Sequence, residues 1–578
     1  MEQLGQGEER RKVALDGLRG ILKLRGEAVM PLLISKLLGG ERKDEPLTVV
    51  QVEAFRAAAS VEQSKKWMPS FMKEIVPVFL NHLRVALSDE EESKSWEDSV
   101  ASVELTRETL RATVVACDER NLRRLTDVLG MGFKSENVII RAETASLTAD
   151  FIRNSDTEFK DLLPHFLKEA LGLYVNLESV VLAAAMDMML ALETKFGKEE
   201  LSEHVDFVRQ TISNSVSFLK HASKGCPLPR DEKGEVLLPG LCQKKGLKPF
   251  LGFLQHGLQR SRDQRHAAAK LYGDLVSLTD KDSLKPFLIK ITGPLIRGVG
   301  DRLQSNVKVA ILHALSLILD KGGVKLKPFM PQLQTTFMKA IASDSEQVRS
   351  SASSALSKLV KITTRVDPLV KDLCTQITNV ATAVDDDDPV SVAVRAVLLS
   401  TLCDVLKSVG QKLKEKSVQL AVETLVGLRG KYDTDVRSRH SVAEGIVLSH
   451  RYVSEEDLET YLKDLLSNVD AVSTSSDAEL RHAYALEMAA VSAHVLNKIS
   501  SSQAQSVLRE AVSSLDDDNV LVQIAYVRCV SNFCTGGSVE VVKELKSSVV
   551  KALNELCDTS SNKELLSLCK SVLNALLE

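Results

Sequence analysis

The chain has 578 residues, of which 44% are hydrophobic and only 4% aromatic, and 74 Lys and Arg stand against 78 Asp and Glu. This length exceeds what one ordinary globular core holds, and a net charge of −4 gives no global electrostatic case for direct DNA binding or for a membrane surface. So few aromatic residues argue against a large β domain and against a stacking surface for single-stranded nucleic acid.

Cysteine usage and hydropathy indicate a protein of the cell interior. The nine Cys are scattered without a C-x-x-C pair, which is typical of reduced thiols in a cytosolic or nuclear protein. No segment reaches the roughly 18 unbroken apolar residues of a membrane span, and the most apolar stretch, 180–191, contains Asp187. The N-terminus has no signal-peptide character. We therefore expect a cytoplasmic protein with no membrane partner.

Residues 1–221 are expected to form N-terminal HEAT-like repeats, each a pair of amphipathic helices. The first pair is predicted at 12–24 and 28–38, and later second helices begin near Arg141 and Val180. A helical hairpin of this size has too little apolar surface to be stable alone. Such hairpins therefore stack on their neighbours and bury a continuous core.

Residues 222–247, ASKGCPLPRDEKGEVLLPGLCQKKGL, interrupt the helical pattern. Their Gly, Pro and charged residues exclude a continuous helix. Long loops in a compact stack usually have a function of their own. Two alternatives stay open for this segment: a loop packed along the stack, or a binding loop.

The repeats are most regular in residues 248–410, where two consecutive units have nearly the same sequence pattern. Lys285-Pro286-Phe287 and Lys327-Pro328-Phe329 open the two copies, 42 residues apart. An apolar helical pattern, a turn with Asp and an Ala-rich second helix follow each opening. A period of this length in a helical pattern is the signature of HEAT or armadillo repeats, and the chain has room for about 13 such hairpins.

A basic residue near the start of each second helix recurs at intervals of 41 to 46 residues. The position is taken in turn by Arg265, Lys308, Arg349, Arg395, Arg437 and Arg481, with Gln523 in the same place. Positions shared by every repeat usually serve stacking. We expect these side chains to pair with an Asp or a backbone carbonyl of the adjacent unit.

Residues 411–578 are expected to form C-terminal HEAT-like repeats that close the stack. Two acidic turns, Asp385–Asp388 and Asp516–Asp518, lie where the repeat needs a helix N-terminus. Capping and interaction with the helix dipole explain them better than a metal site does. The predicted fold class is therefore all-α, an α-solenoid (superhelix) of HEAT/armadillo-like repeats.

No sequence motif for catalysis, cofactor binding or metal binding is present. There is no P-loop, no G-x-G-x-x-G, no H-E-x-x-H and no G-x-S-x-G. The eleven His show no metal-ligand spacing. We therefore predict no enzyme and no cofactor, but a binding surface, since α-solenoids present a concave face lined by their second helices.

The strings ITGPLIR (291–297), GDR (300–302) and LKPFMPQLQTTFMKA (326–340) resemble the C-terminal HEAT region of the general control non-derepressible one family. Residues 239–246, PGLCQKKG, also resemble the loop that precedes this region in the family. Members of the family are HEAT-repeat translational activators. The specific similarity covers about residues 236–365, and weaker repeat-level similarity extends to both ends.

The resemblance implies a scaffold that binds the RWD domain of the initiation factor two alpha kinase. It would help activate that kinase on ribosomes in response to amino-acid starvation or ribosome stalling. Basic residues of this stretch are implicated in kinase binding in the family. The matching positions here are Arg297 and Arg302, with Lys308 a weaker candidate. The ribosome is a second partner that the resemblance implies.

Two other functions are compatible with the same residues. One is a generic HEAT-repeat adaptor for transport, phosphatase or cytoskeletal partners. The other is an enzyme, which a deep pocket lined by convergent titratable groups would favour. Family members are several times longer, so a fragment, a split gene and a shortened paralogue are all alternatives for this chain.

Overall fold

The computed structural model describes residues 8–38, 46–88, 101–222, 228–300, 303–382, 388–429, 435–535 and 539–577. Within these ranges the regular structure is α-helix with short 3-10 turns. The one extended pairing among them is an isolated antiparallel bridge between Arg230 and Val236. The predicted all-α solenoid of repeated hairpins is confirmed.

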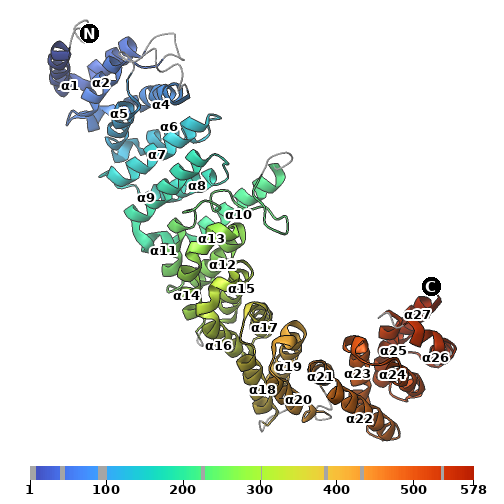
Figure 1. Cartoon of the computed structure of the whole chain (residues 1–578). Helices are drawn as coiled ribbons and strands as arrows, with labels where there is room; N and C mark the ends of the chain where they lie inside the picture. The colour runs from blue at the N-terminus through green and yellow to red at the C-terminus, as the bar shows by residue number, and fades with distance from the viewer. Residues whose placement is uncertain are drawn as a thin grey trace. The chain divides into compact units, whose positions relative to one another are not determined.

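The chain folds as two compact units, Met1–Gly322 and Gly323–Glu578. Figure 1 labels the helices of both units along the chain. The helices of the first unit are α1 (Glu8–Leu37), α2 (Val49–Ala59), α3 (Ser64–Trp67), α4 (Met72–Ser88), α5 (Val103–Val115), α6 (Leu122–Phe133), α7 (Val138–Asn154), α8 (Leu163–Leu173), α9 (Ser179–Glu203), α10 (Val205–Ala222), α11 (Lys248–Gly257), α12 (Arg262–Leu278), α13 (Lys281–Leu284), α14 (Leu288–Gly298) and α15 (Ser305–Gly322).

The helices of the second unit pair into consecutive hairpins. They are α16 (Met330–Ile341), α17 (Glu346–Ile362), α18 (Asp367–Ala381), α19 (Pro389–Val409), α20 (Glu415–Val426), α21 (Val436–His450), α22 (Glu455–Ser473), α23 (Ala478–His494), α24 (Ser501–Ser513), α25 (Val520–Thr535), α26 (Val539–Thr559) and α27 (Lys563–Leu577). The boundaries of the four segments expected from the sequence stay a prediction.

Second helices of the first unit pack side by side, with α5 against α7 and α7 against α9. Ion pairs cross both of these contacts: Arg111 of α5 lies 2.8 Å from Asp150 of α7, and Arg153 of α7 pairs with Asp187 of α9. Partly exposed pairs of this kind add little stability each. They do favour one register between neighbouring helices, because a slipped register would separate the charges.

The two Lys-Pro-Phe strings have the same local structure. Each ends a 3-10 turn, η6 (Lys285–Phe287) and η7 (Gly323–Phe329), and the first helix of a hairpin starts at the next residue. Pro suits such a position because the amide hydrogen that it lacks would have no helical partner there. The second helices then bury Ala314 in α15 and Ala352 in α17. These small side chains let neighbouring helices approach closely.

The basic residue near the start of a second helix closes the turn before that helix. Arg349 donates through Nη1 to the carbonyl oxygens of Ser343 and Asp344, at 2.8 and 2.9 Å. Arg141 makes the same pair of bonds to Ser135 and Glu136, both at 2.8 Å. Each of these arginines lies four residues after its N-cap. The expected structural role is therefore found, although these carbonyl acceptors belong to the residue's own hairpin.

In α21 the predicted member of this series is wrong by two residues. Arg437 is exposed, and Arg439 takes the buried position four residues after the N-cap Asp435. Arg439 donates to the Glu479 carbonyl oxygen of the next hairpin, at 3.3 Å. Arg395 lies seven residues after its N-cap, and it pairs as expected with an Asp of the adjacent unit, Asp435, at 3.3 Å. Counting residues between repeats missed the shift in α21, since the turn lengths vary.

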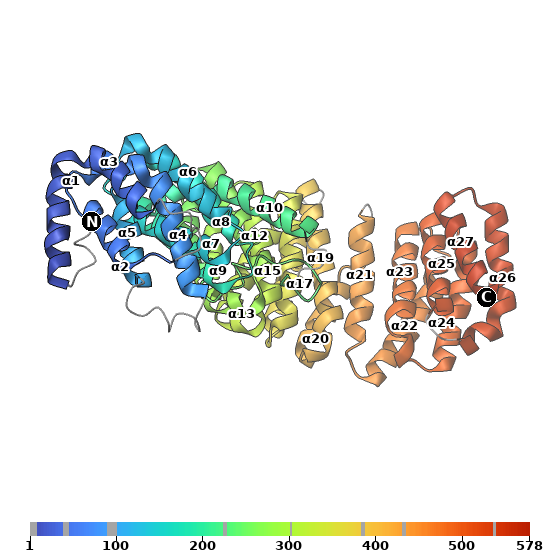
Figure 2. The same cartoon turned by 90° about the horizontal axis from the view of Figure 1, so that it is seen from above.

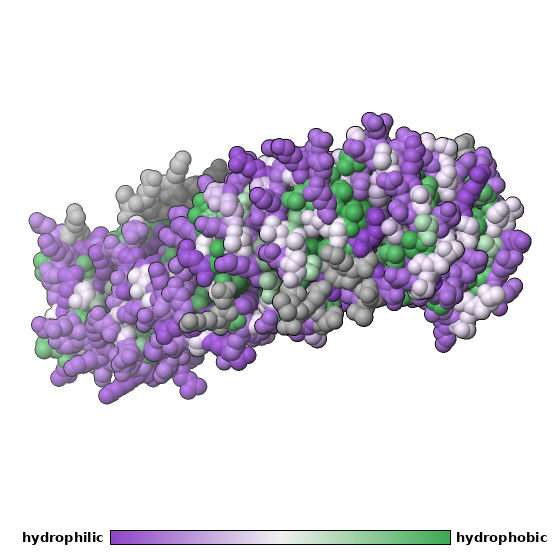
Figure 3. Space-filling model, turned by 90° about the horizontal axis from the view of Figure 1, so that it is seen from below, coloured by the Kyte–Doolittle hydropathy of each residue, from purple (hydrophilic) through white to green (hydrophobic). Residues whose placement is uncertain are grey.

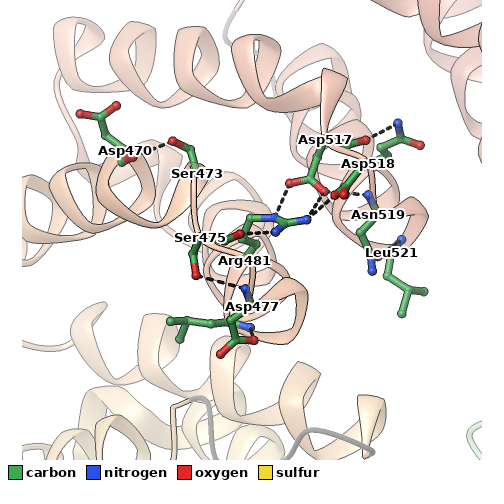
Figure 4. A network of polar contacts seen from close by, with 11 residues as sticks. Asp470, Ser473, Ser475, Asp477, Arg481, Asp517, Asp518, Asn519 and Leu521 are labelled. Carbon is green, nitrogen blue, oxygen red and sulfur yellow. Dashed lines mark hydrogen bonds and ion pairs between the residues drawn. The ribbon is translucent and has the colours of Figure 1, made fainter.

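The acidic turns have different roles from one another. Asp388 caps α19, accepting from the backbone N–H groups of Val390 and Ser391 at 3.2 and 3.1 Å. Asp385 to Asp387 lie outside the described residues. The expected cap role of Asp516–Asp518 is wrong, because Asn519 caps α25 by accepting from the Leu521 N–H at 2.9 Å. Asp517 and Asp518 instead bind the guanidinium of Arg481, as Figure 4 shows.

The described part of the 222–247 segment packs against helices of the first unit. The Leu238 N–H donates to the Leu278 carbonyl oxygen at 3.1 Å, and the Gly240 N–H donates to that of Tyr174 at 2.9 Å. Leu238 and Leu241 are buried. Of the two alternatives, the structure therefore favours the packed loop for residues 228–247.

The second helices of the second unit form one continuous row. Figures 1 and 2 both place α19, α21, α23 and α25 side by side, and in Figure 1 they line the inner side of this unit's curve. One stretch of the described residues, Pro389–Lys412, is long and apolar enough to cross a membrane by length and composition. Half of its most apolar window is buried, and α19 packs between α17 and α21. It has the environment of a core helix in the stack.

Candidate protein-binding surfaces

Helix α14 carries the first predicted contact residue. Its sequence, LIKITGPLIRG, turns Leu288, Ile291 and Leu295 into the core at helical spacing. The opposite side exposes Lys290 and Arg297 beside Ile289, which is 65% exposed. Arg297 lies in the last turn of the helix, where its charge favours the carboxyl end of the helix dipole.

The structure adds a residue to this site that the sequence comparison did not single out. Lys290 is exposed and lies seven residues before Arg297, so both side chains leave α14 on the same face. Ile289 stands beside them. Two cations and one apolar side chain thus share the outer surface of a first helix. Helical spacing counted back from Arg297 would have found Lys290.

The two other predicted contact residues follow α14. Lys308 is half-buried in the first turn of α15, at the position four residues after Gln304, whose carbonyl oxygen accepts its N–H at 3.1 Å. Arg302 lies outside the described residues, as does Asp301. The structure therefore brings Arg297 together with Lys290, and leaves Lys308 less accessible than either.

A larger concave surface lies in the second unit. It is a groove of about 1240 Å³ that runs across the second helices α17, α19, α21, α23, α25 and α27. We call it the second-helix groove. Its wall includes Lys361 of α17, Ser400 of α19, Arg437 of α21 and Arg528 of α25. On the face that Figure 3 shows, hydrophilic side chains predominate and hydrophobic ones form smaller groups.

Two observations concern the reactive side chains of the described residues. No group of three or more His, Cys, Asp or Glu among them could hold a metal ion. Burial raises the pKa of Cys117, Cys242 and Cys529 to about 12 and that of Cys374 to about 11. Such thiols stay protonated near neutral pH, whereas a nucleophilic Cys needs a lowered pKa.

Paired helices of about 40 residues, stacked through a shared core, define an α-solenoid of HEAT repeats. Two family models, both described as stalled ribosome sensor GCN1-like HEAT repeats, match residues 29–245 and 367–577. The chain belongs to this GCN1-like HEAT-repeat family.

Three relatives illustrate the similarity. Protein ILITYHIA of Arabidopsis thaliana is 30% identical over 556 residues, covering 95% of this chain and 19% of the relative. The stalled ribosome sensor GCN1 of Homo sapiens is 27% identical over 556 residues, covering 94% and 19%. The eIF-2-alpha kinase activator GCN1 of Dictyostelium discoideum is 28% identical over 454 residues, covering 78% and 15%. The chain thus spans less than a fifth of the length of these relatives.

Among solved structures, importin beta is similar, with a TM-score of 0.41 and 12% identity, covering 100% of this chain and 73% of that one.

Proposed function

We propose that this chain is a non-catalytic cytoplasmic scaffold that regulates translation. It binds the RWD domain of the initiation factor two alpha kinase and helps to activate that kinase on ribosomes when amino acids are scarce or ribosomes stall. The observation that carries this function is the match of most of the chain to relatives named as kinase activator and as stalled ribosome sensor.

The outer face of α14 is the surface that we propose for the kinase contact. Lys290 and Arg297 are exposed there, and Ile289 adds an exposed apolar side chain to the same face. An Arg next to an apolar side chain is common at the centre of a protein interface. Its planar guanidinium can donate two parallel hydrogen bonds to one carboxylate. Arg302, five residues after Arg297 in the sequence, is proposed for the same contact from the family resemblance alone. Lys308 contributes less, because it is half-buried.

The test is a binding titration of the full chain against the isolated RWD domain of the kinase from the same organism. The variants are Arg297→Ala, Arg302→Ala, Lys290→Ala and Lys308→Ala. Arg262→Ala is the matched control, since Arg262 is an exposed arginine at the start of α12, outside this face. We expect the wild type to bind, and the Arg297 and Arg302 substitutions to weaken binding about tenfold. Lys308→Ala should weaken it less, and the control should not change it.

Two results would change these assignments. Binding that none of the four substitutions weakens would keep the kinase as partner and move the contact elsewhere. Absence of binding by a folded wild-type chain would contradict the kinase function. A generic HEAT adaptor for other protein partners would then be the better function, and the second-helix groove, which lies outside α14, is the observation that favours it.

Ribosome association is tested separately. We expect the full chain to co-sediment with ribosomes in a sucrose gradient, and to do so more strongly at low salt if exposed Lys and Arg side chains contact ribosomal RNA. A chain that stays at the top of the gradient at every salt concentration would limit the proposed function to the kinase.

A further inference from the structure

The second-helix groove has an apolar floor. Val397 of α19, Leu486 of α23 and Ile524 of α25 line it, with small Ser side chains such as Ser400 of α19 and Ser441 of α21 beside them. No Phe, Tyr or Trp is among the described residues that line the groove. An apolar floor without such rings does not suit single-stranded nucleic acid, which binds by stacking its bases on aromatic side chains. It suits the apolar side of a polypeptide.

The rim of the groove is positively charged. Lys358 and Lys361 of α17, Arg437 of α21 and Arg528 of α25 line it, and Lys361, Arg437 and Arg528 are exposed. The carboxylates of the groove are Glu346, Asp404 and Glu564.

One of these three carboxylates is paired with a cation of the wall, since Arg528 lies 3.1 Å from Glu564. Ser357 donates to Asp404 at 3.5 Å, which leaves the negative charge of Asp404 in place. His482 adds no charge near neutral pH, because burial lowers its pKa to about 4. Beyond the Arg528–Glu564 pair, the lining contains more cations than carboxylates: Arg349, Lys358, Lys361 and Arg437 against Glu346 and Asp404.

We propose that the second-helix groove binds an acidic amphipathic helix of a protein partner. The apolar side of that helix lies on Val397, Leu486 and Ile524, and its carboxylates face Lys361 and Arg437. The contact belongs to the second unit, so it is a different site from α14 and goes beyond the proposed kinase function. This is the helix-in-groove mode of recognition, in which residues at helical spacing enter an apolar channel.

The size of the groove matches such a ligand. Neighbouring helices lie roughly 9 Å apart, so the whole groove, from α17 to α27, is about 45 Å wide and its central part, from α19 to α25, about 27 Å. A helix of about 18 residues has that length and, at about 11 Å diameter, fills roughly 2500 Å³. The groove holds about 1240 Å³. Because this volume is spread over all six helices, the central part takes up less than half of the helix and leaves its polar side in water, as amphipathicity requires.

The experiment measures binding of a fluorescent synthetic helix to the full chain by anisotropy. The probe is a peptide of about 18 residues made of Leu, Ala and Glu, with Leu on one face and Glu on its flanks. Its matched control has Lys at every Glu. The protein variants are Arg437→Glu and Ser400→Glu, both at exposed residues of the groove wall. Lys371→Glu is the control for charge reversal, because Lys371 is exposed on the first helix α18 and does not line the groove.

We expect the acidic peptide to bind with a Kd on the order of 10 μM and the basic peptide at least about tenfold more weakly. Arg437→Glu and Ser400→Glu should each raise the Kd about tenfold or more, and Lys371→Glu less than about twofold. Circular dichroism confirms that each variant is folded. Glu at position 437 suits the first turn of α21, so this variant should not unfold.

Three outcomes would overturn the proposal. Equal binding of the acidic and basic peptides would show that the charge of the rim does not select the ligand. An equal effect of Lys371→Glu and Arg437→Glu would show that the peptide responds only to overall charge. Binding of a uridine oligonucleotide that Arg437→Glu abolishes and that the acidic peptide cannot displace would make the groove a nucleic-acid site.

Discussion

Arg481 on α23 holds Asp517, in the turn before α25, through nitrogen–oxygen distances of 2.8 and 3.1 Å (Figure 4). The same guanidinium donates to the carbonyl oxygen of Ser475, in the turn before its own helix. One side chain therefore joins the turns of two consecutive hairpins. A planar guanidinium can do this because its donors point in fixed directions toward both acceptors.

Replacing Arg481 with Ala should destabilise the second unit by about 2 to 4 kcal/mol. It removes the cation from the Asp517 carboxylate, which keeps only the Asn519 N–H at 2.8 Å, and it removes the guanidinium donor from the Ser475 carbonyl. The side chains of Arg481 and Asp517 are only 9% and 11% exposed, so water replaces the lost bonds poorly. Urea unfolding followed by circular dichroism measures the effect.

Arg509→Ala is the control for that measurement, since Arg509 is exposed on α24, and it should change stability by less than about 0.5 kcal/mol. Equal effects of the two substitutions would mean that the Arg481 contact does not stabilise the stack.

Acidification should destabilise the second unit through His482. Burial, followed by the charges of Arg439, His440 and Arg528, lowers the pKa of His482 to about 4. An unfolded chain has a His pKa of about 6.5, so between these values the unfolded state binds more protons and stability falls as pH falls. From about pH 7 to about pH 5 the loss should be roughly 1 to 2 kcal/mol.

A His482→Asn variant separates this effect from other titrations. It removes the ionisable group, so its unfolding free energy should depend less steeply on pH over the same interval, whatever its stability at neutral pH. Urea titrations at several pH values give both slopes. Parallel slopes for wild type and variant would show that His482 is not the group responsible.

Gly240→Ala should loosen the packed loop of the first unit. A Cβ at Gly240 would lie 2.3 Å from the ring of Tyr174, whose side chain is fully buried and has no room to move. We expect a loss of about 2 to 3 kcal/mol and faster tryptic cleavage after Lys233 or Lys244.

Gly172→Ala is the matched control, because nothing lies within 4 Å of its new Cβ, and it should leave cleavage unchanged. Rapid cleavage of the wild-type loop at these lysines would contradict the packed arrangement.

The buried thiols should react slowly with an aromatic disulfide reagent in the folded chain. The pKa of Cys117, Cys242, Cys529 and Cys569 is raised to about 12, so the thiolate is scarce at about pH 8. Modification of these four should be at least about a hundredfold slower than in urea, where all nine Cys react. A fast-reacting thiol among the four would reopen the possibility of a nucleophilic site.

Local patterns predicted the helices well because their causes are local. The two Lys-Pro-Phe strings precede first helices, as expected, since Pro costs no hydrogen bond at the start of a helix. The second helices expected near Arg141 and Val180 are α7 and α9. Register inside a helix was predicted less well. Arg437 was predicted for the buried basic position of α21, which Arg439 occupies. The average spacing between repeats does not predict the length of each individual turn.

The candidate sites were predicted in part. Arg297 is exposed on α14, as a contact residue must be, but Lys290 joins it only because both leave the same side of that helix. Lys308 is half-buried by the packing of α15, which its own sequence neighbourhood does not reveal. The second-helix groove joins residues from Glu346 to Glu564, so no short sequence window could have indicated it.

The sequence by itself determined the helical hairpins, their stacking and the family, because helix propensity, turn residues and a repeat near 42 residues act within a short span of chain. The tertiary structure decided which polar residues meet. Arg481 and Asp517 lie 36 residues apart in the chain, and only the stacking of α23 on α25 brings them into contact. Likewise, the charge and shape of the second-helix groove arise from side chains of six helices. Such surfaces depend on the angle by which each hairpin is rotated relative to the preceding hairpin. Packing across the whole core sets that angle.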